Sequence, residues 1–344
     1  MKLLKKLSES QGIPGREDRI RTLVTEEMRP LVDDLRIDPL GNVIGHKRGK
    51  GKVKVMIAAH MDEIGFMVNH IDDKGFLRIL PVGGWDPRTM IAQRVTVHGQ
   101  QDLPGIIGTK PVHILTEEEK KKPLKVKDFF IDVGLPPEKV KELVSVGDVV
   151  TMVQEMSEIG EAVTGKSFDD RLGIYVMLEA LRKVPKHEVD IYAVASVQEE
   201  VGLRGAIVSS YGIEPHAGIA LDVTIASDTP GSEDHERVTL MGGGTAIKLM
   251  DSSSISDYKL VQFFKDIAAE RKIKYQLEIL PRGGTDAGAI QRTKSGAPVI
   301  TISIPTRYVH SVVEMAHKED IQASINLLTA FLEVAHQGLF TTQG

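Results

Sequence analysis

The spacing of apolar residues divides the chain into three stretches, and the first begins with helices. Leucines recur at helical spacing within residues 1–15, which predicts an amphipathic first helix. A second helix is predicted over 19–28, a turn and short strand over 38–46, and a strand over 52–59. The first 60 residues therefore lead from two helices into a sheet.

The second stretch, residues 65–156, has a β-rich texture with frequent Gly and Pro. Its apolar runs are FMVNHI, FLRILPV, QRVTVHG, GIIGT and DVVTMV. Short, evenly spaced strands with turn signals predict a small all-β barrel or sandwich. The charged segment TEEEKKKPLKVKD lies inside this stretch, and we interpret it as a solvated surface loop.

In the third stretch, from about Thr164 onward, helical and strand patterns alternate. The predicted helices cover 170–184, 202–212, 256–272 and 320–336, and the predicted strands cover 189–197, 217–223 and 298–305. Alternation at this spacing predicts an α/β fold. The expected architecture is a mixed, doubly wound sheet sandwiched by helices, formed by residues 1–64 and 157–344. An all-β barrel domain, residues 65–156, is inserted into it.

The composition of the chain limits which metal ligands and which partners are possible. The chain of 344 residues has no cysteine, so any metal must be held by His, Asp and Glu. The net charge of −5, with acidic and basic residues mixed, predicts no nucleic-acid partner. Lysines interrupt the start of the chain, and no apolar run approaches the roughly 18 residues that cross a bilayer. We therefore expect a cytoplasmic protein without membrane contact.

Potential metal ligands follow the strongly apolar runs. Those at or just after the predicted strands are His60, Glu199, Glu200, Asp222 and His310. Asp169 and Asp170 begin a predicted helix. Because ligands of open α/β sheets bind outside the carboxyl ends of the strands, these side chains are expected to meet at one edge of the sheet.

Each of these residues has a simpler interpretation when it is taken alone. His46 also ends a short β-like run, so position does not single out the other histidines. Asp169 and Asp170 have the composition of a helix N-cap and first turn. The adjacent glutamates suit a solvated strand end, and Asp222 suits a cap on the following loop. Only the ordered set of strand ends favours a metal site.

Charge counting supports two cations in such a site. The carboxylates of Asp169, Glu200 and Asp222 supply three negative charges against four positive ones, and a bridging hydroxide balances the sum. Nitrogen and oxygen ligands without sulfur suit zinc first, or cobalt or manganese. Glu199 is then left over as a general base. Because successive strand residues point to opposite sides, the two glutamates need a turn, which Gly202 is able to supply.

Eight motifs, in order, resemble one family of di-metal aminopeptidases. They are AAHMDEIGFMV, GGWDPRTMIAQRV, SFDDRLGIYVMLE, VQEEVGLRGA, IALDVTIASDTPG, GGGTAIKLMD, LPRGGTDAGAI and PTRYVHS, and they span nearly the whole chain. The family includes the glutamyl aminopeptidases and the tetrahedral (TET) aminopeptidases, and its fold is of the zinc-peptidase type. Some members carry the label cellulase or endoglucanase, which is the competing function.

The resemblance implies a role for each matching residue. Asp169 bridges two metal ions, Glu200 and His310 complete one site, and His60 and Asp222 complete the other. Glu199 acts as the general base for a bridging hydroxide nucleophile, and Asp62 orients His60. The bond between Asp169 and Asp170 is expected to be cis. These implied roles are assigned to the following residues: His60, Asp62, Asp169, Glu199, Glu200, Asp222 and His310.

The resemblance also implies substrate and assembly. The substrates are short peptides with a free N-terminus, because one metal receives the α-amine. The inserted β domain mediates a homodimer, which assembles further into a tetrahedral dodecamer. The glycine-rich segment 242–244 and the residues Arg282, Gly283 and Gly284 are expected to shape the substrate cleft. Arg282 is a candidate for holding an acidic first side chain.

Three other functions stay open from the sequence. A metal-dependent deacylase or carboxypeptidase of related fold would cleave N-blocked substrates. An endoglucanase would need a cleft rich in aromatic side chains, but the chain has one Trp and only 5% aromatic residues. A non-catalytic scaffold would need neither Glu199 nor Asp62.

Overall fold

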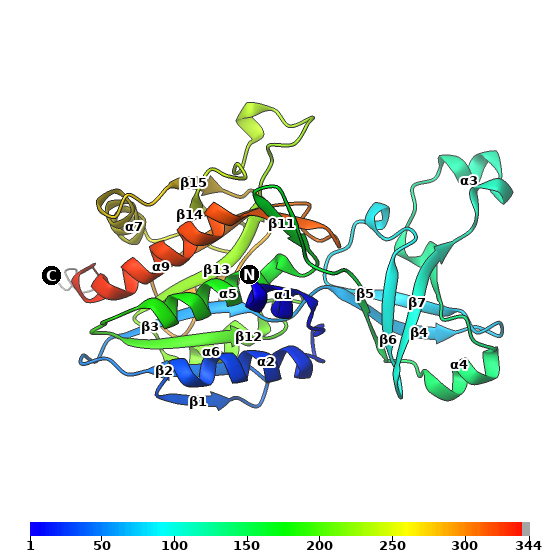
Figure 1. Cartoon of the computed structure of the whole chain (residues 1–344), viewed down its shortest axis with the longest axis horizontal. Coiled ribbons are helices and arrows are strands. Elements are labelled where there is room, and N and C mark those ends of the chain that lie inside the picture. The colour runs from blue at the N-terminus through cyan, green and yellow to red at the C-terminus, as the bar shows by residue number, and fades with distance from the viewer. Residues whose placement is uncertain (339–344) are drawn as a thin grey trace.

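A large mixed sheet with helices on both faces carries a closed β-barrel at one end in the computed structural model, which describes residues 1–338 (Figure 1). The last six residues of the predicted range 157–344 lie outside this description. The strands of the sheet are β1 (Asp34–Ile37), β2 (Val43–Lys47), β3 (Lys54–His60), β10 (Ser157–Ile159), β11 (Ala162–Gly165), β12 (Asp190–Ser196), β13 (Ala217–Ile225), β14 (Thr245–Met250), β15 (Tyr275–Ile279), β16 (Val299–Arg307) and β17 (Glu314–His317).

The order of the strands is β1-β2-β12-β3-β13-β16-β17-β11-β10, with β14 beside β16 and β15 beside β14. The four central strands β12, β3, β13 and β16 are parallel, and the outer pairs β1–β2, β2–β12 and β16–β17 are antiparallel. The carboxyl ends of the four central strands therefore lie along one edge. The prediction of a mixed α/β sheet is confirmed.

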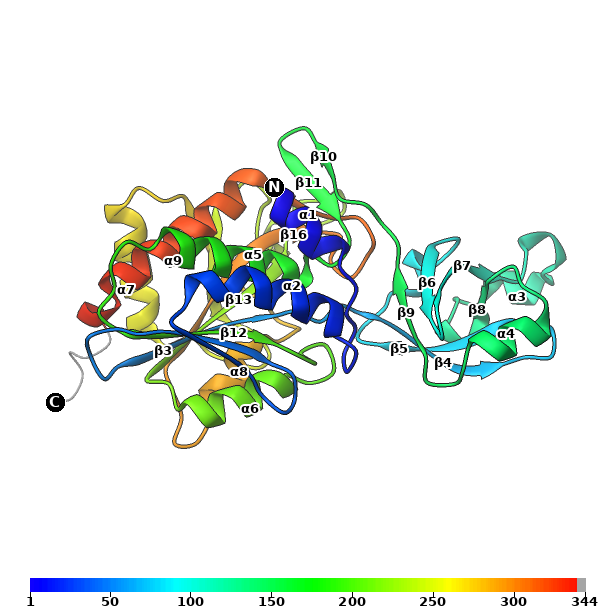
Figure 2. The same cartoon turned by 60° about the horizontal axis from the view of Figure 1, so that its bottom comes forward.

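Helices cover both faces because the central strands are apolar on both sides. Along β3, Val55, Ile57 and Ala59 pack into one buried cluster, whereas Met56 and Ala58 pack into another. Figure 2 shows the two helical layers on opposite sides of the sheet. One layer holds α1 (Lys2–Glu9), α2 (Asp18–Met28), α5 (Phe168–Lys183), α7 (Tyr258–Glu270) and α9 (Lys318–Gly338); the other holds α6 (Arg204–Ile213) and α8 (Asp286–Gln291).

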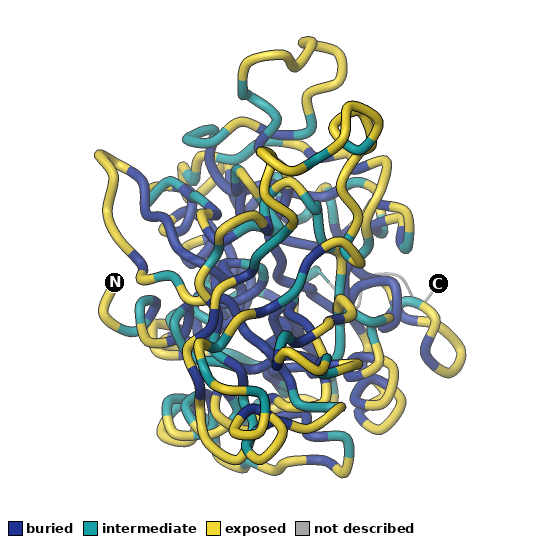
Figure 3. The backbone as a smooth tube through the Cα atoms, turned by 90° about the vertical axis from the view of Figure 1, so that its right-hand side faces the viewer, coloured by how far each residue is buried: buried dark blue, intermediate teal, exposed yellow. Residues whose placement is uncertain are grey.

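The barrel has a core of its own. It closes in the order β4-β5-β8-β7-β6-β9 around a buried cluster that includes Phe66, Leu77 and Phe129. Viewed from the barrel end, buried backbone lies at the centre of the molecule and exposed loops surround it (Figure 3). Its elements are β4 (Gly65–Ile71), β5 (Leu77–Val82), β6 (Arg94–His98), β7 (Asp102–Thr109), α3 (Glu117–Lys121), β8 (Phe129–Asp132), α4 (Pro137–Leu143) and β9 (Val149–Met152).

The predicted small all-β barrel is confirmed, with two differences in detail. Strand β8 was missed, because its apolar run is only three residues long and lies between two aspartates. The charged segment is exposed, as predicted, but it contains α3, where Thr116 and Glu119 form a capping box. The domain boundaries at residues 65 and 156 stay a prediction. Within residues 1–338, every helix is too short or too polar to cross a membrane.

Candidate metal centre

The candidate ligands gather at the carboxyl edge of the central strands. His60 is the last residue of β3, and it pairs in register with Ser196 at the end of β12. Asp222 lies inside β13, as in the predicted strand 217–223, and β13 continues to Ile225 along β16. The pairing of β13 with β3 stops at Ala220, so Asp222 reaches the edge at the level of His60.

Two groups of ligands meet at this edge and share Asp169. His60, Asp169 and Asp222 form one group, and Asp169, Glu200 and His310 form the other; within each group the ligand atoms lie within 4.8 Å of one another. Nε2 of His60 is 2.9 Å from Oδ1 of Asp169, and Nε2 of His310 is 3.2 Å from Oδ2. The two oxygens of one carboxylate therefore face different histidines.

Asp169 and Asp170 have separate tasks. Asp170 binds backbone N–H groups. One of its carboxylate oxygens accepts a hydrogen bond from the N–H of Gly173 (2.8 Å), and the other accepts one from the N–H of His60 (3.2 Å). Asp169 has non-helical backbone angles, and its side chain faces the histidines. The bond between the two residues is cis, as the resemblance implied. The N-cap interpretation therefore describes Asp170 and not Asp169.

Glu199 and Glu200 lie on a turn after β12, and the carboxylate of Asp62 holds both. Its two oxygens accept the backbone N–H of Glu199 (3.0 Å) and of Glu200 (3.1 Å). The predicted turn at Gly202 is present, with φ +121° and an N–H donated to the carbonyl of Glu199. Oε2 of Glu199 is 3.9 Å from Nε2 of His60, so Glu199 lies beside the ligand groups.

Asp62 contacts His60 through its backbone more closely than through its side chain. Nδ1 of His60 is 3.1 Å from the carbonyl oxygen of Asp62 and 3.6 Å from its carboxylate. An N–H at Nδ1 leaves Nε2 free to ligate a metal. Asp62 thus contacts the histidine and both glutamates together.

The crowding of buried carboxylates shifts the pKa of each group. Burial raises the pKa of Glu199 and of Asp222 well above the usual range, and neighbouring carboxylates raise both further. Burial would lower the pKa of His310, but hydrogen bonds to Asp169 and Glu200 raise it to about 12. Ionised carboxylates at this density are stable only beside cations.

The donor set fits divalent metal ions. Oxygen and imidazole ligands suit zinc, cobalt and manganese. Oε1 of Glu200 is buried and lies 3.2 Å from Nε2 of His310, which itself lies 3.2 Å from Oδ2 of Asp169. Such an atom fits the position of a metal ligand. His46, in contrast, stacks on Tyr192 (4.4 Å between ring centroids) with Nε2 3.2 Å from Asp190, outside both ligand groups.

A cleft of about 470 Å³ opens onto the ligand groups and onto Glu199. Arg282, Gly283 and Gly284 line it, and Lys248 and Thr224 also line it at depth. The prediction for segment 242–244 is wrong. Its N–H groups at Gly242 and Gly244 donate instead to the buried carboxylate of Asp320 at 2.6 and 2.7 Å. This loop anchors α9 and does not line the cleft.

Sequence reasoning missed buried polar residues behind the ligands. Glu314 accepts the backbone N–H of Asp169 (3.2 Å) and of His310 (2.8 Å), so it ties two ligand segments together. Burial raises its pKa to about 8. Asp286 accepts a hydrogen bond from Ser196, and burial raises its pKa to about 6. Neither residue follows an apolar strand run. A search for polar residues at the ends of predicted strands therefore could not find them.

Comparison with known proteins identifies the family. The family model described as M42 glutamyl aminopeptidase matches residues 41–327. The chain belongs to this family. The M42 membership makes it a metal-dependent aminopeptidase, a hydrolase of peptide bonds, as predicted, and it does not favour a deacylase, carboxypeptidase or endoglucanase.

Relatives of this M42 chain match it along nearly its whole length. A lysyl aminopeptidase of Pyrococcus furiosus is 40% identical over 339 residues, which cover 96% of each chain. The structure of an aminopeptidase from the archaeon Desulfurococcus kamchatkensis is 44% identical and has a TM-score of 0.95, covering 100% of this chain and 97% of that one. The TET1 peptidase of Pyrococcus horikoshii, described as assembling into a tetrahedron or a large octahedral shell, is 32% identical with a TM-score of 0.86, covering 96% and 98%.

Proposed function

We propose that this chain removes N-terminal residues from short peptides at a co-catalytic pair of divalent ions, zinc first among them. The observation that carries the proposal is the position of Asp169 in both ligand groups. Glu200 and His310 would hold one ion with Asp169, and His60 and Asp222 would hold the other. Divalent ions bound there would polarise the peptide carbonyl and lower the pKa of the attacking water.

Glu199 is proposed as the proton carrier. Its side chain lines the cleft but belongs to neither ligand group. It would accept the proton of the attacking water and return it to the leaving nitrogen. Its backbone is held by Asp62, so the carboxylate keeps its position through both transfers.

A panel of amide substrates tests the proposal. The metal-free enzyme should be inactive on the p-nitroanilides of Leu, Lys and Glu, and reconstitution with zinc, cobalt or manganese should restore turnover. N-blocked versions of the same substrates should be refused. Turnover of the free amides after complete chelation, verified by elemental analysis, would contradict the proposal.

The same panel tests the side-chain preference. Arg282 is exposed at the mouth of the cleft, where its guanidinium would attract an acidic first side chain. The expected result is then a preference for the Glu substrate that Arg282→Gln weakens. Because the Pyrococcus furiosus relative is described as a lysyl aminopeptidase, a Lys or Leu preference is the alternative outcome, and it would remove Arg282 from this role.

We also propose that the barrel pairs two subunits, and that dimers assemble into a tetrahedral dodecamer. Apolar side chains are exposed on the barrel, among them Leu80 (55%), Ile106 (51%) and Val153 (43%). The described assembly of the TET1 relative supports the same arrangement. Light scattering after size-exclusion chromatography should give a mass of two or twelve subunits. A monomer at micromolar concentration would contradict it.

A further inference from the structure

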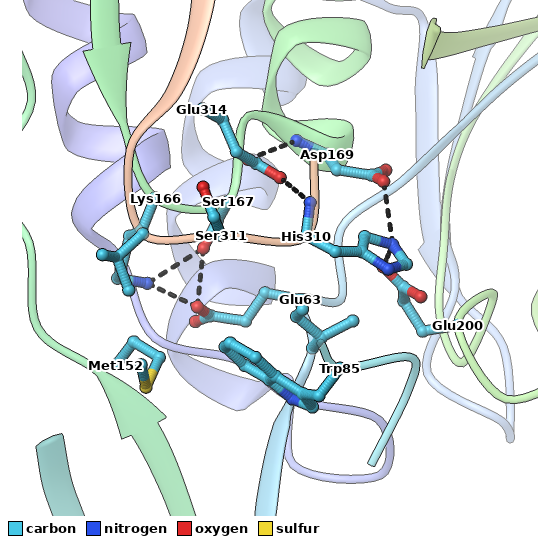
Figure 4. A pocket seen from close by; sticks show the side chains of 12 residues that line it. Glu63, Trp85, Met152, Lys166, Ser167, Asp169, Glu200, His310, Ser311 and Glu314 are labelled. Atoms are coloured by element: carbon cyan, nitrogen blue, oxygen red, sulfur yellow. Dashed lines mark hydrogen bonds and ion pairs between the residues drawn. The ribbon is translucent and has the colours of Figure 1, made fainter. Parts of the chain in front are cut away.

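A second, much smaller pocket borders the ligand group of Asp169, Glu200 and His310 from the side of the barrel (Figure 4). We refer to it as the inner pocket. These three side chains line both the inner pocket and the 470 Å³ cleft, but the inner pocket has a volume of only about 10 Å³. That is room for one group the size of a water molecule.

The barrel closes the inner pocket with residues 83–85, the loop that follows β5. A Cβ on Gly84 would lie 3.2 Å from Nδ1 of His310, and a Cβ on Gly83 would lie 3.4 Å from Cβ of Glu200. Gly83 also has φ +85°, which favours glycine. The backbone of an inserted loop therefore lies directly against two of the proposed metal ligands.

Trp85 makes this closure rigid. Its ring stacks on Phe66 of β4 (4.8 Å between centroids), and its Nε1–H donates to the carbonyl of Gly65 (3.0 Å). In Figure 4, Trp85 and Met152 lie along the lower side of the pocket, away from Asp169. From the catalytic side, Val312 packs into the barrel core two residues after His310. The wall of the inner pocket thus packs against the barrel and is also connected to the segment that carries His310.

The remaining wall of the inner pocket is polar, and its polar side chains form hydrogen bonds with one another. Nζ of Lys166 is 2.5 Å from Oε2 of Glu63, and Oγ of Ser167 donates to the same oxygen (2.6 Å). All three side chains are at least nine-tenths buried. The pocket is lined by four carboxylates, including Glu63 and Glu314, together with Lys166 and His310.

We propose that the inner pocket receives the free α-amine of the substrate, and that residues 83–85 of the barrel stop any extension beyond it. This inference rests on the proposed function. An amine has the size that the pocket admits, and the pocket borders the ligand group beside which the peptide bond would be cleaved. A formyl or acetyl group, or a preceding residue, would need space that Trp85 occupies. Trp85 is therefore a specificity-determining residue, and the inserted barrel helps to restrict cleavage to unblocked N-termini.

The first test needs no variant. Calorimetric titration of the zinc-loaded enzyme with leucinol, N-methyl-leucinol and N-formyl-leucinol, which have no amide bond after the leucine unit to hydrolyse, should show affinity falling with each larger group on the nitrogen. We expect at least a tenfold loss from the free amine to the formyl compound. Equal affinity for all three would overturn the inference.

Two variants then enlarge the pocket. For Trp85→Ala and for the milder Trp85→Leu, the kcat/KM for N-formyl-Leu-p-nitroanilide, divided by that for Leu-p-nitroanilide, should rise at least tenfold. Phe130→Ala is the matched control, because Phe130 is a half-buried barrel aromatic that stacks edge-on with Phe76, away from the pocket. This control should keep the wild-type ratio.

The outcomes separate the two proposals. If the wild-type enzyme does not cleave Leu-p-nitroanilide, the proposed function fails. If the wild type cleaves it but a folded Trp85 variant keeps the wild-type ratio, only the inner-pocket inference fails. Thermal unfolding of each variant, compared with Phe130→Ala, shows which variants are folded.

Discussion

Replacing Glu199 with Gln is expected to lower kcat by roughly 10²–10⁴-fold while leaving the metal content unchanged. Gln has the same shape but cannot accept the proton of the attacking water. The metal should remain because Glu199 belongs to neither ligand group and lies 3.9 Å from His60. Steady-state kinetics on Leu-p-nitroanilide, with elemental analysis of the same sample, measures both quantities.

The control for this prediction is Glu214→Gln. Glu214 is 61% exposed and pairs with Lys294 on the surface, so its loss should change kcat little. Near-normal turnover in Glu199→Gln would remove Glu199 from the role of general base. Loss of metal in that variant would instead make Glu199 a ligand.

The second large effect is expected for Asp169→Asn, which should lose both metal equivalents and nearly all activity. The two carboxylate oxygens face Nε2 of His60 and Nε2 of His310, and an amide offers only one oxygen to replace them. The affinity for metal should fall by more than the roughly 10–100-fold that follows loss of an outer hydrogen-bond partner. Metal titration of the apo-protein followed by elemental analysis measures the loss.

Asp222→Asn is the matched comparison, because Asp222 belongs to one ligand group only. It should retain close to one equivalent of metal where Asp169→Asn retains none. If Asp169→Asn still binds two equivalents, Asp169 is not shared between the ions. A single equivalent in the wild type would also contradict a two-ion centre.

Local patterns predicted the elements that carry the site. The apolar runs before His60, Asp222 and His310 are long enough to be recognised without tertiary information, because a strand buried on both faces must be apolar throughout. Weaker elements were missed for the same reason. The short strands β8 and β17 obtain their stability from partners far along the chain, so their own residues carry little signal.

The hydrogen bonds that hold the ligand segments could not be predicted from the sequence, although Asp62 had been expected to orient His60. Glu314 and the carboxylate of Asp62 each accept two backbone N–H groups from other segments. A carboxylate with this task has no periodicity and no motif of its own, since its partners are backbone groups of any residue type. The same applies to Asp320, which holds a loop that had been assigned to the cleft.

The sequence by itself determined the fold class, the set of candidate ligands and the absence of sulfur ligands, because these follow from hydrophobic periodicity and residue type. Only the tertiary structure decided that both oxygens of Asp169 face histidines, that Asp170 serves the backbone, and that residues 83–85 of the barrel close the inner pocket against His310. Distances of 3 Å between residues more than 100 positions apart depend on how strands register and layers pack, and no local pattern encodes them.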